Sequence, residues 1–376
     1  MIENPQNDKT DILYRFYKEK HKMPDNFVKH SKKALVAMSG GVDSAVSALL
    51  TIKAGYETHG TTMSLVAQNS EGVSQDILDA KAICDRLGIP HEVLHLESEF
   101  RKYVISEFVN SYIIGETPNP CVICNKNLKF GLLLDHALKS GYDTIVTGHY
   151  ANIKKDGDRY LLCRASDPKK DQSYVMWMLT QSQLSRIFFP LGDMTKSEVR
   201  DIAEQNGFNN AHKHDSQDIC FIPDGDYIKF IKEFTGKSFP KGNFLDVDGN
   251  ILGRHEGIIN YTPGQRKGLG IAFGKPMYVK SKDAAANTVT LCENESLFSS
   301  RLTAHAMNLI ALDRIDAPMK VYAKIRYNHT AAHATVLQTG DDSFELIFDE
   351  PQRAIAKGQS AVLYDGDVVI GGGFID

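Results

Sequence analysis

The sequence predicts an α/β fold with a doubly wound parallel sheet, followed by a small mixed or β domain and a C-terminal β-barrel. From Lys33 to about Tyr150, buried strand runs alternate with helical runs that stop at glycines. This alternation is typical of a parallel sheet covered by helices. After Cys220 the chain changes to short strands separated by turn residues, which is typical of β domains. The length of 376 residues fits two or three domains.

Strands and helices follow one another regularly in the first half of the chain. The strand runs are KALVAM, ETHGTTM, HEVLHL and DTIVTGHY, and the helical runs are AVSALLTIKAG, DILDAKAICDRLG, FRKYVISEFVNSYI and NLKFGLLLDHALKSG. Gly55 and Gly88 are expected to close the first two helices, because glycine readily adopts the left-handed conformation that ends a helix. TKSEVRDIAEQNG predicts a further helix, since Thr195 and Glu198 form a capping box. Ligands of such sheets bind beyond the carboxyl ends of the strands.

Four segments are expected along the chain: an N-terminal extension (1–32), the α/β domain (33–220), a central β-rich domain (221–290) and the barrel (291–376). Within the central domain, FLDVDGNILGR predicts a strand pair around an Asp-Gly turn. The central segment holds ten Lys/Arg against seven Asp/Glu, and the last segment seven against twelve. The positive balance of the central segment is compatible with a nucleic-acid contact, although the whole chain carries a net charge of −4.

The composition excludes several classes of protein. Hydrophobic residues make up 42% and charged residues 24% of the chain, as in soluble globular proteins. No apolar run approaches the roughly 20 residues of a membrane helix, so we expect no membrane span. The acidic N-terminus fits neither a transit peptide nor a signal peptide. Six cysteines in a chain of this length do not form a disulfide scaffold, and the reducing cytoplasm is the expected compartment.

VAMSGGVDSAVSALL is the sharpest signal in the chain, because its glycines lie between a strand and a helix and direct backbone N–H groups at an anion. Ser39 and Ser44 add hydroxyl donors, and Asp43 could hold Mg²⁺. The lysine of a P-loop and the G-x-G-x-x-G of a dinucleotide loop are both absent. The stretch resembles the SGGxDS motif of the ATP-pyrophosphatase (PP-loop) family, which has the adenine nucleotide alpha hydrolase-like fold. An ordinary Ser/Gly-rich turn is the alternative.

The PP-loop resemblance implies that ATP is split between its α- and β-phosphates to adenylate a carbonyl oxygen. The ATP site is expected at the loop and at the ends of two neighbouring strands. Its residues would be Ala37, Met38, Ser39, Gly40, Gly41, Val42, Asp43, Ser44, Met63 and Gly148.

TPNPCVICNKNLKF contains Cys121 and Cys124 at a spacing that serves several chemistries. It could be half of a zinc site, a redox pair, an inert packed pair or a thiol that handles sulfur. A helix beginning near Asn125 would place its positive end beside Cys124 and lower the pKa of that thiol. A third cysteine, Cys220, lies in HKHDSQDICFIPDGDY, where an Ile-Cys-Phe run alone favours a core position.

The segments SGGVDS, TPNPCVICN, TGHY, KDQSY, DSQDICFI, GQRKGLGI and GGG occur in the order found in the tRNA-specific 2-thiouridylases. The resemblance runs from about Lys33 to the C-terminus. It implies that ATP adenylates the C2 oxygen of a flipped wobble uridine and that persulfide sulfur replaces this oxygen, releasing AMP and pyrophosphate. It also implies that Cys220 receives the persulfide from a sulfur-donor protein, and that Cys124 frees the sulfur and ends in a Cys124–Cys220 disulfide.

Cys121 departs from the family pattern, because many members have aspartate there, and that aspartate is assigned acid/base or base-contacting work. A thiol is a weaker acid with different hydrogen bonding, so the proton shuttle differs here. We include Cys121 with Cys124 and Cys220 as catalytic. The three thiols could also hold an iron–sulfur cluster or zinc.

The resemblance further implies a set of tRNA-binding residues, which are Asn119, Pro120, Cys121, His149, Lys170, Asp171, Gln172, Arg326, Tyr327 and Gln359. A buried strand-end histidine is the alternative for His149. Arg266 and Lys267 in YTPGQRKGLG suit a phosphate contact or an ordinary hairpin tip. Two rival functions are an amide-forming PP-loop ligase, which needs no paired cysteines, and a metal-bound RNA-binding module without catalysis.

Overall fold

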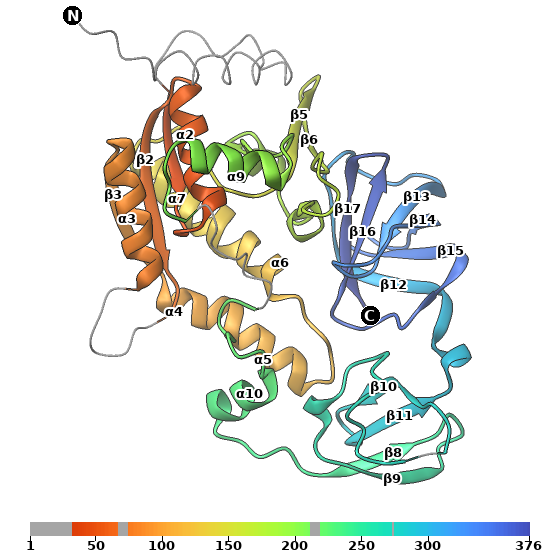
Figure 1. Ribbon diagram of the computed structural model, residues 1–376. Helices are drawn as coiled ribbons and strands as arrows, with labels where there is room; N and C mark the ends of the chain where they lie inside the picture. The colour runs from red at the N-terminus through yellow and green to blue at the C-terminus, as the bar shows by residue number, and fades with distance from the viewer. Residues whose placement is uncertain (1–31, 67–73, 211–218, 273) are drawn as a thin grey trace, which may run out of the picture.

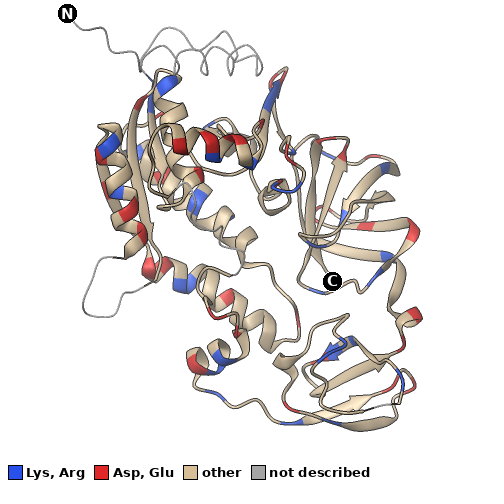
Figure 2. Ribbon diagram, viewed as in Figure 1, with Lys and Arg blue, Asp and Glu red and all other residues tan. Residues whose placement is uncertain are grey.

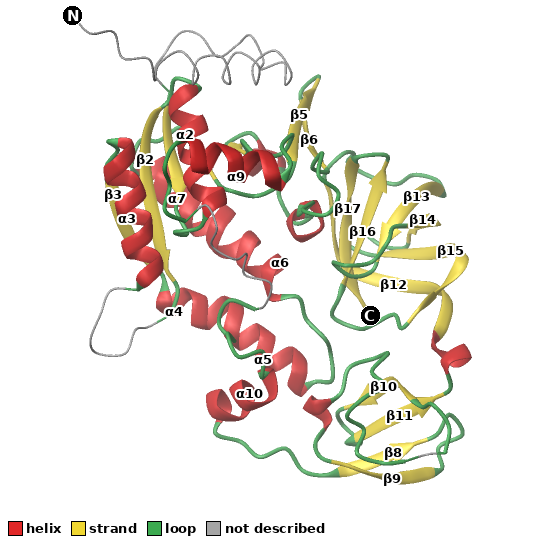
Figure 3. Ribbon diagram, viewed as in Figure 1, coloured by secondary structure: helices red, strands yellow, loops and turns green. Residues whose placement is uncertain are grey.

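The computed structural model describes residues 32–66, 74–210, 219–272 and 274–376. The predicted N-terminal extension lies outside the described residues except for Lys32, as does the whole of HKHDSQD. The described chain forms an α/β domain, a central β domain and a C-terminal barrel, arranged around helix α6 (Figures 1 and 3).

A five-stranded parallel sheet of order β3-β2-β1-β4-β7 forms the α/β domain and confirms the predicted class. Leu35 and Ile145 face one hydrophobic core, while Val36 and Val146 face a second core on the opposite side. This alternation follows from the pleat, which points successive side chains to opposite faces. The strands are β1 (Lys33–Ala37), β2 (Glu57–Ser64), β3 (His91–His95), β4 (Thr144–Val146) and β7 (Ile187–Phe188).

Helices cover both faces of this sheet, and their ends match the predicted caps. Gly88 has φ +68° at the end of α3, and Thr195 and Glu198 exchange capping-box bonds at the start of α9. The helices are α2 (Val42–Lys53), α3 (Gln75–Leu87), α7 (Leu133–Lys139) and α9 (Lys196–Gln205), with short η4 (Ser173–Met176) and α8 (Gln181–Leu184).

Two long helical segments lead toward the centre of the molecule, and each contains a π-helical stretch. The first consists of α4 (Glu97–Phe100), η2 (Arg101–Ile105) and α5 (Ser106–Ile113), and the second of α6 (Pro120–Cys124), η3 (Asn125–Leu132) and then α7. The prediction of a helix beginning near Asn125 is wrong. The helix begins at Pro120, because the Asn119 side chain accepts a hydrogen bond from Cys121 N and proline suits the first helical position.

The central domain is a four-stranded sheet of order β10-β11-β8-β9 that packs on α5. Phe108 and Tyr112 of α5 share a hydrophobic core with Phe244 and Val279 of this sheet. The predicted hairpin around the Asp-Gly turn is present as β8 and β9. The elements are α10 (Tyr227–Thr235), β8 (Gly242–Leu245), β9 (Ile251–His255), η5 (Ile258–Asn260), β10 (Tyr278–Asp283), β11 (Thr288–Cys292) and η6 (Asn294–Leu297).

Six C-terminal strands close into the predicted barrel, because β12 pairs with both β15 and β17. The α/β domain lends its β5–β6 hairpin to this sheet through the pair Cys163–Val368. A side chain at Gly372 would approach the Trp177 ring to 2.9 Å, so the glycine run lets the barrel pack on the α/β domain. The strands are β5 (Asn152–Asp156), β6 (Arg159–Cys163), β12 (Phe298–Leu309), β13 (Met319–Lys324), β14 (Ala332–Gln338), β15 (Phe344–Arg353), β16 (Ser360–Asp365) and β17 (Val368–Ile375).

Within the described ranges, none of the helices has the length and apolarity needed to cross a membrane.

Candidate active site

The loop between β1 and α2 lies at the carboxyl edge of the parallel sheet, where the sequence predicts the ATP phosphates. Gly41 N–H donates to Ser39 Oγ at 3.4 Å, and Ser44 Oγ donates to Gly41 O at 2.9 Å. Gly40 has φ +71°, and a side chain there would meet Asp76 O at 2.6 Å. The loop therefore needs glycine at position 40 both for its conformation and for its closeness to α3.

Asp43 is the charged centre of this loop and is already paired. Lys196 Nζ donates to both carboxylate oxygens of Asp43 at 2.8 Å, and Tyr150 OH donates to Oδ1 at 2.8 Å. The Lys196 side chain is only 11% exposed. The sequence analysis missed this lysine, because 153 residues separate it from Asp43 and no local spacing links the two. The fold thus supplies from α9 the cation that the loop itself lacks.

The sequence predicts that Asp43 could hold Mg²⁺, and the Asp43–Lys196 ion pair lies at the same carboxylate. Lys196 bonds to both Asp43 oxygens and Tyr150 bonds to Oδ1, which leaves one lone pair of Oδ2 for a metal ion. A metal ion at Asp43 would therefore share the carboxylate with Lys196, and no step below uses a metal.

Residues 148–150, which follow β4, join the nucleotide loop to the rest of the site. A side chain at Gly148 would approach the Asp43 backbone to 2.9 Å, so this close packing requires glycine. Tyr150 bonds to Asp43 through its hydroxyl, and its backbone N–H donates to Gln172 Oε1 at 2.9 Å. Tyr150 therefore links the predicted ATP loop to one of the predicted tRNA residues. It lies in the TGHY segment but was not among the predicted site residues.

The three cysteines expected to be catalytic lie near one another. Cys121 and Cys220 are exposed, whereas Cys124 is only 8% exposed. Ionisation of Cys220 or of Cys121 raises the pKa of Cys124, and ionisation of Cys121 raises that of Cys220. Such coupling requires the thiols to be close in space. All the described cysteines are free, so a Cys124–Cys220 disulfide is not formed here.

The predicted lowering of the Cys124 pKa is wrong. Burial raises the pKa of this thiol to about 11, with Lys129 opposing the shift. Cys124 lies inside the continuous helical segment formed by α6 and η3, so no helix N-terminus faces it. Protein atoms around the sulfurs of Cys121 and Cys220 likewise raise the pKa of both thiols by desolvation. The resting site therefore holds thiols, and Cys124 needs activation before it can attack.

Alkylation of Cys124 should show this high pKa directly. Because only the thiolate reacts, the rate with iodoacetamide should rise about tenfold per pH unit from pH 7 toward pH 10. Lys129→Met should slow alkylation further, since Lys129 lowers the pKa of Cys124. Peptide mass spectrometry of pulse-labelled protein measures the rate. A rate that levels off near pH 7 would contradict the burial of Cys124.

Lys129 is a further site residue that the sequence analysis did not single out, although it lies in the quoted TPNPCVICNKNLKF segment. Its positive charge lowers the pKa of all three site thiols, those of Cys121, Cys124 and Cys220. Its Nζ donates to His149 Nε2 at 3.2 Å. An ammonium can only donate, so the neutral His149 ring carries its proton on Nδ1 and donates it to Thr147 Oγ1 at 2.7 Å.

His149 is buried and faces the protein, which agrees with the alternative of a strand-end histidine. Burial, reinforced by Lys129, holds the pKa of His149 well below its usual range. Its contacts orient Lys129 toward the cysteines, and no bound tRNA is needed to explain its position.

A cluster or zinc at the three cysteines is not supported by the arrangement. In the part of the chain that the structure describes, no group of three His, Cys, Asp or Glu side chains is placed to hold a metal ion. The thiols are close enough to affect one another but are not arranged as ligands of one ion.

Two of the predicted tRNA residues, Tyr327 and Asp171, lie near each other. Tyr327 lies near Cys121 and Asp171, because the charges of both raise its pKa in addition to burial. Asp171 accepts hydrogen bonds from Ala165 N and Ser173 N, so its carboxylate shapes its own loop.

The remaining predicted tRNA residues have contacts within the protein. Arg326 donates to Arg353 O at 3.3 Å, and Gln359 Nε2 donates to Thr117 O at 2.6 Å. Lys170 N–H donates to Asp167 O. Asn119 caps α6, and Pro120 is buried as its first residue.

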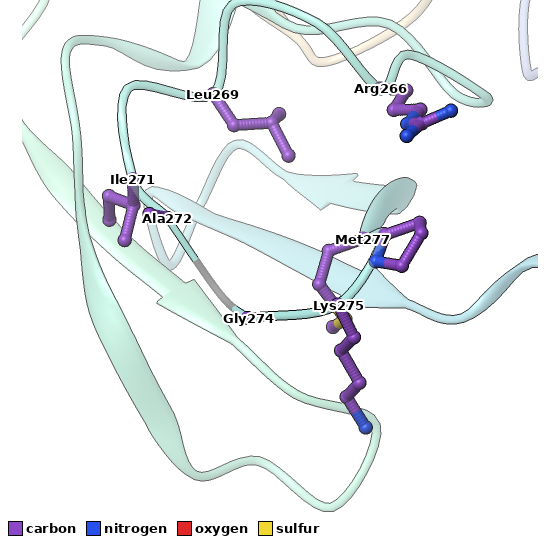
Figure 4. Close-up of a pocket in the computed structure, with 8 residues that line it drawn as sticks. Arg266, Leu269, Ile271, Ala272, Gly274, Lys275 and Met277 are labelled. Carbon is purple, nitrogen blue, oxygen red and sulfur yellow. The ribbon is translucent and has the colours of Figure 1, made fainter.

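Arg266 lies in the central domain. It lines an open pocket of about 380 Å³ with Leu269, Ile271, Ala272, Gly274, Lys275, Pro276 and Met277. Figure 4 shows the charged ends of Arg266 and Lys275 well apart, which does not resemble a single phosphate cradle. Lysine and arginine are spread over all three domains in Figure 2 and alternate with acidic residues.

The fold and site define a class of enzyme: an α/β nucleotide-binding domain with an SGGxDS loop, coupled to a cluster of thiols and carrying two β domains. Family models match the chain consecutively as the tRNA methyl transferase HUP domain (residues 32–224), the tRNA methyl transferase PRC-barrel domain (228–293) and the aminomethyltransferase beta-barrel domain (299–375). The chain belongs to the tRNA-specific 2-thiouridylase family, as its curated relatives demonstrate.

The relatives match nearly the full chain. A tRNA-specific 2-thiouridylase MnmA from Treponema denticola is 48% identical over 92% of this chain and 98% of its own length. Proteins of the same name from Acetivibrio thermocellus and Clostridioides difficile are 47% and 45% identical over 92% of this chain, and over 99% and 98% of their own lengths.

Similar solved structures are more distant. The U34-tRNA thiolase NcsA from Methanococcus maripaludis, solved with its [4Fe-4S] cluster, has a TM-score of 0.37 and 17% identity, covering 61% of this chain and 74% of its own. An NH3-dependent NAD synthetase from Campylobacter jejuni has a TM-score of 0.34 and 18% identity, covering 62% and 86%.

Proposed function

We propose that this protein is a tRNA-uridine 2-sulfurtransferase that uses ATP to replace the C2 oxygen of the wobble uridine with sulfur. The observation that carries the proposal is the mutual influence of Cys121, Cys124 and Cys220, linked through Lys129 and residues 148–150 to the SGGVDS loop. An ATP-activating loop and a thiol cluster in one site suit a reaction that first activates an oxygen and then displaces it with sulfur.

The first step is adenylation of the uridine oxygen. The C2 oxygen attacks the α-phosphate of ATP, pyrophosphate leaves, and the oxygen becomes part of a good leaving group, AMP. Loop N–H groups and the start of α2 suit the phosphates, and Lys196 supplies positive charge beside them. Any Mg²⁺ that enters with ATP would share the Asp43 carboxylate with Lys196.

The second step is sulfur transfer. The terminal sulfur of a Cys220 persulfide attacks C2 and expels AMP, leaving the tRNA joined to Cys220 through a disulfide. The Cys124 thiolate then attacks the Cys220 sulfur, which releases 2-thiouridine and forms the Cys124–Cys220 disulfide. A cellular thiol must reduce this disulfide before the next turnover. The high pKa of Cys124 keeps this thiol inactive at rest, and Lys129 is the adjacent cation that favours its thiolate.

Cys121 takes the place of the aspartate of many family members and is proposed to move the proton at the uridine. Cys121→Ala is therefore expected to lower the thiolation rate by about 10²-fold, the usual size of an acid/base contribution. Cys121→Asp restores the carboxyl group and should stay within about tenfold of the wild type. Single-turnover thiolation assays compare the variants. Equal losses in both would exclude the acid/base role.

The partners follow from this chemistry: a tRNA substrate and a protein that delivers persulfide sulfur, both in the cytoplasm. A zinc or iron–sulfur centre at the three cysteines is not part of the proposal, because the described side chains do not form a metal-binding group.

Mass spectrometry of tRNA nucleosides after incubation with ATP and a persulfide donor tests the function. The proposal predicts 2-thiouridine in amounts equal to the AMP formed. An amide-forming ligase would add no sulfur to tRNA, and a methyltransferase would require S-adenosylmethionine instead of ATP. If tRNA gained no sulfur with any persulfide donor, the proposal would be withdrawn.

A further inference from the structure

The segment 115–119 between α5 and α6, called the strap below, is held by both β domains. Figure 1 shows it passing along the side of the α/β domain that faces them. Thr117 N–H donates to Lys357 O at 2.8 Å, and Gln359 Nε2 donates to Thr117 O at 2.6 Å. Lys282 Nζ of the central domain donates to Glu116 O at 3.2 Å. Three consecutive polar groups of the strap backbone are therefore satisfied by other domains.

The contact between strap and barrel is close enough to restrict side chains. Gly358 has φ +82°, and a side chain there would lie 2.9 Å from Glu116 Cβ. Glycine is therefore needed beside Gln359 for the barrel loop to reach the strap.

Lys282 is an unusual residue for a domain contact. Its ammonium lies 5.5 Å from the centre of the Tyr112 ring, and burial lowers its pKa to about 8, with Glu116 opposing the shift. An apolar side chain would fill such a place without this desolvation cost. Unlike an apolar residue, Lys282 donates a hydrogen bond to the carbonyl of Glu116 in the strap.

The strap leads directly to the cysteine-bearing helix. Asn119, its last residue, accepts a hydrogen bond from Cys121 N at 3.1 Å, and Pro120 begins α6. Pro118 and Pro120 restrict the backbone between Thr117 and the helix. A displacement of the strap therefore moves Cys121 and Cys124 relative to Cys220, which lies on a separate segment.

We propose that Gln359 and Lys282 are positioning residues that set the location of the Cys121–Cys124 helix for sulfur transfer. The inference rests on the proposed function for its chemistry, and it assigns Gln359 a role within the protein in addition to the predicted tRNA contact. Each of the two β domains holds part of the strap. Correct docking of both domains is then a condition for the cysteines to meet, and a displacement of about 1 Å can cost 10²-fold in rate.

Two variants that remove one donor each test the proposal: Gln359→Met and Lys282→Met. The kcat for thiolation should fall at least about tenfold in both, while KM for tRNA stays within about threefold. Formation of the Cys124–Cys220 disulfide by diamide in tRNA-free protein should slow by a similar factor. Lys282→Arg, which keeps a donor, should restore both rates, and Lys280→Met at an exposed position of the same strand should change neither.

The possible results distinguish a positioning role from a direct tRNA contact. A raised KM for tRNA with an unchanged disulfide rate would make Gln359 a tRNA contact only and overturn the proposal. Equal loss in Lys282→Arg and Lys282→Met would overturn the role of the donated bond. The diamide reaction needs neither ATP nor tRNA, so it tests the strap even if the wild-type protein forms no 2-thiouridine. Thermal unfolding of each variant shows whether a slowed reaction reflects lost structure.

Discussion

Replacing Cys220 with serine is expected to abolish 2-thiouridine formation while pyrophosphate release from ATP continues in the presence of tRNA. A hydroxyl cannot carry the persulfide, so the sulfur path is cut after the oxygen has been activated. Loss of a nucleophile typically lowers a rate by 10³-fold or more. Cys220 is exposed and belongs to no described hydrophobic core cluster, so the fold should be retained. Parallel assays of pyrophosphate and of tRNA nucleosides measure the two steps separately.

The buried Cys292 of the central domain offers a control. Its pKa is shifted by burial, Lys280 and Arg353, and not by another described thiol. Cys292→Ala should keep both steps. Thiolation by Cys220→Ser at the wild-type rate would remove Cys220 from the sulfur path. Loss of pyrophosphate release together with thiolation would mean that the thiol also supports activation, against the proposed division of the steps.

Lys196→Met is expected to lower pyrophosphate release by about 10²-fold or more, the size found when one preorganised donor at a charged transition state is removed. Lys196 neutralises Asp43 in the phosphate loop. Without it, an unpaired carboxylate would face the incoming triphosphate and repel it. The double variant Asp43→Asn/Lys196→Met should therefore recover part of the ATP affinity, which equilibrium binding of a non-hydrolysable ATP analogue measures.

Lys81→Met is the matched control, since Lys81 is exposed on α3 and pairs with Asp85. It should leave ATP binding and cleavage unchanged. Normal pyrophosphate release in Lys196→Met would show that the Asp43–Lys196 pair stabilises the fold and takes no part in ATP cleavage.

Much of the fold could be predicted because its signals are local. Alternating strand and helix runs, the left-handed Gly88 and the Thr195 capping box each act within a few residues, and the structure confirms them. The start of the cysteine-bearing helix was predicted five residues too late. The Asn119–Pro120 pair is itself a helix-start signal, which the prediction did not use.

The site residues also differ in whether local sequence signals identify them. The loop residues and the three cysteines lie in short motifs and could be selected from the sequence. Lys196 could not, because only the packing of α9 on α2 brings it to Asp43. The pKa of Cys124 was predicted in the wrong direction, because desolvation depends on packing from distant segments, including Phe221 in the same core. Gln359 likewise meets Thr117 across 242 residues of sequence.

The oxygen balance of AMP formed in water enriched in ¹⁸O tests the central claim most directly. If the uridine oxygen attacks the α-phosphate and leaves with AMP, the AMP formed along with 2-thiouridine will contain no ¹⁸O. If water cleaves ATP instead, one ¹⁸O atom will appear in each AMP, and activation of the uridine oxygen would be contradicted.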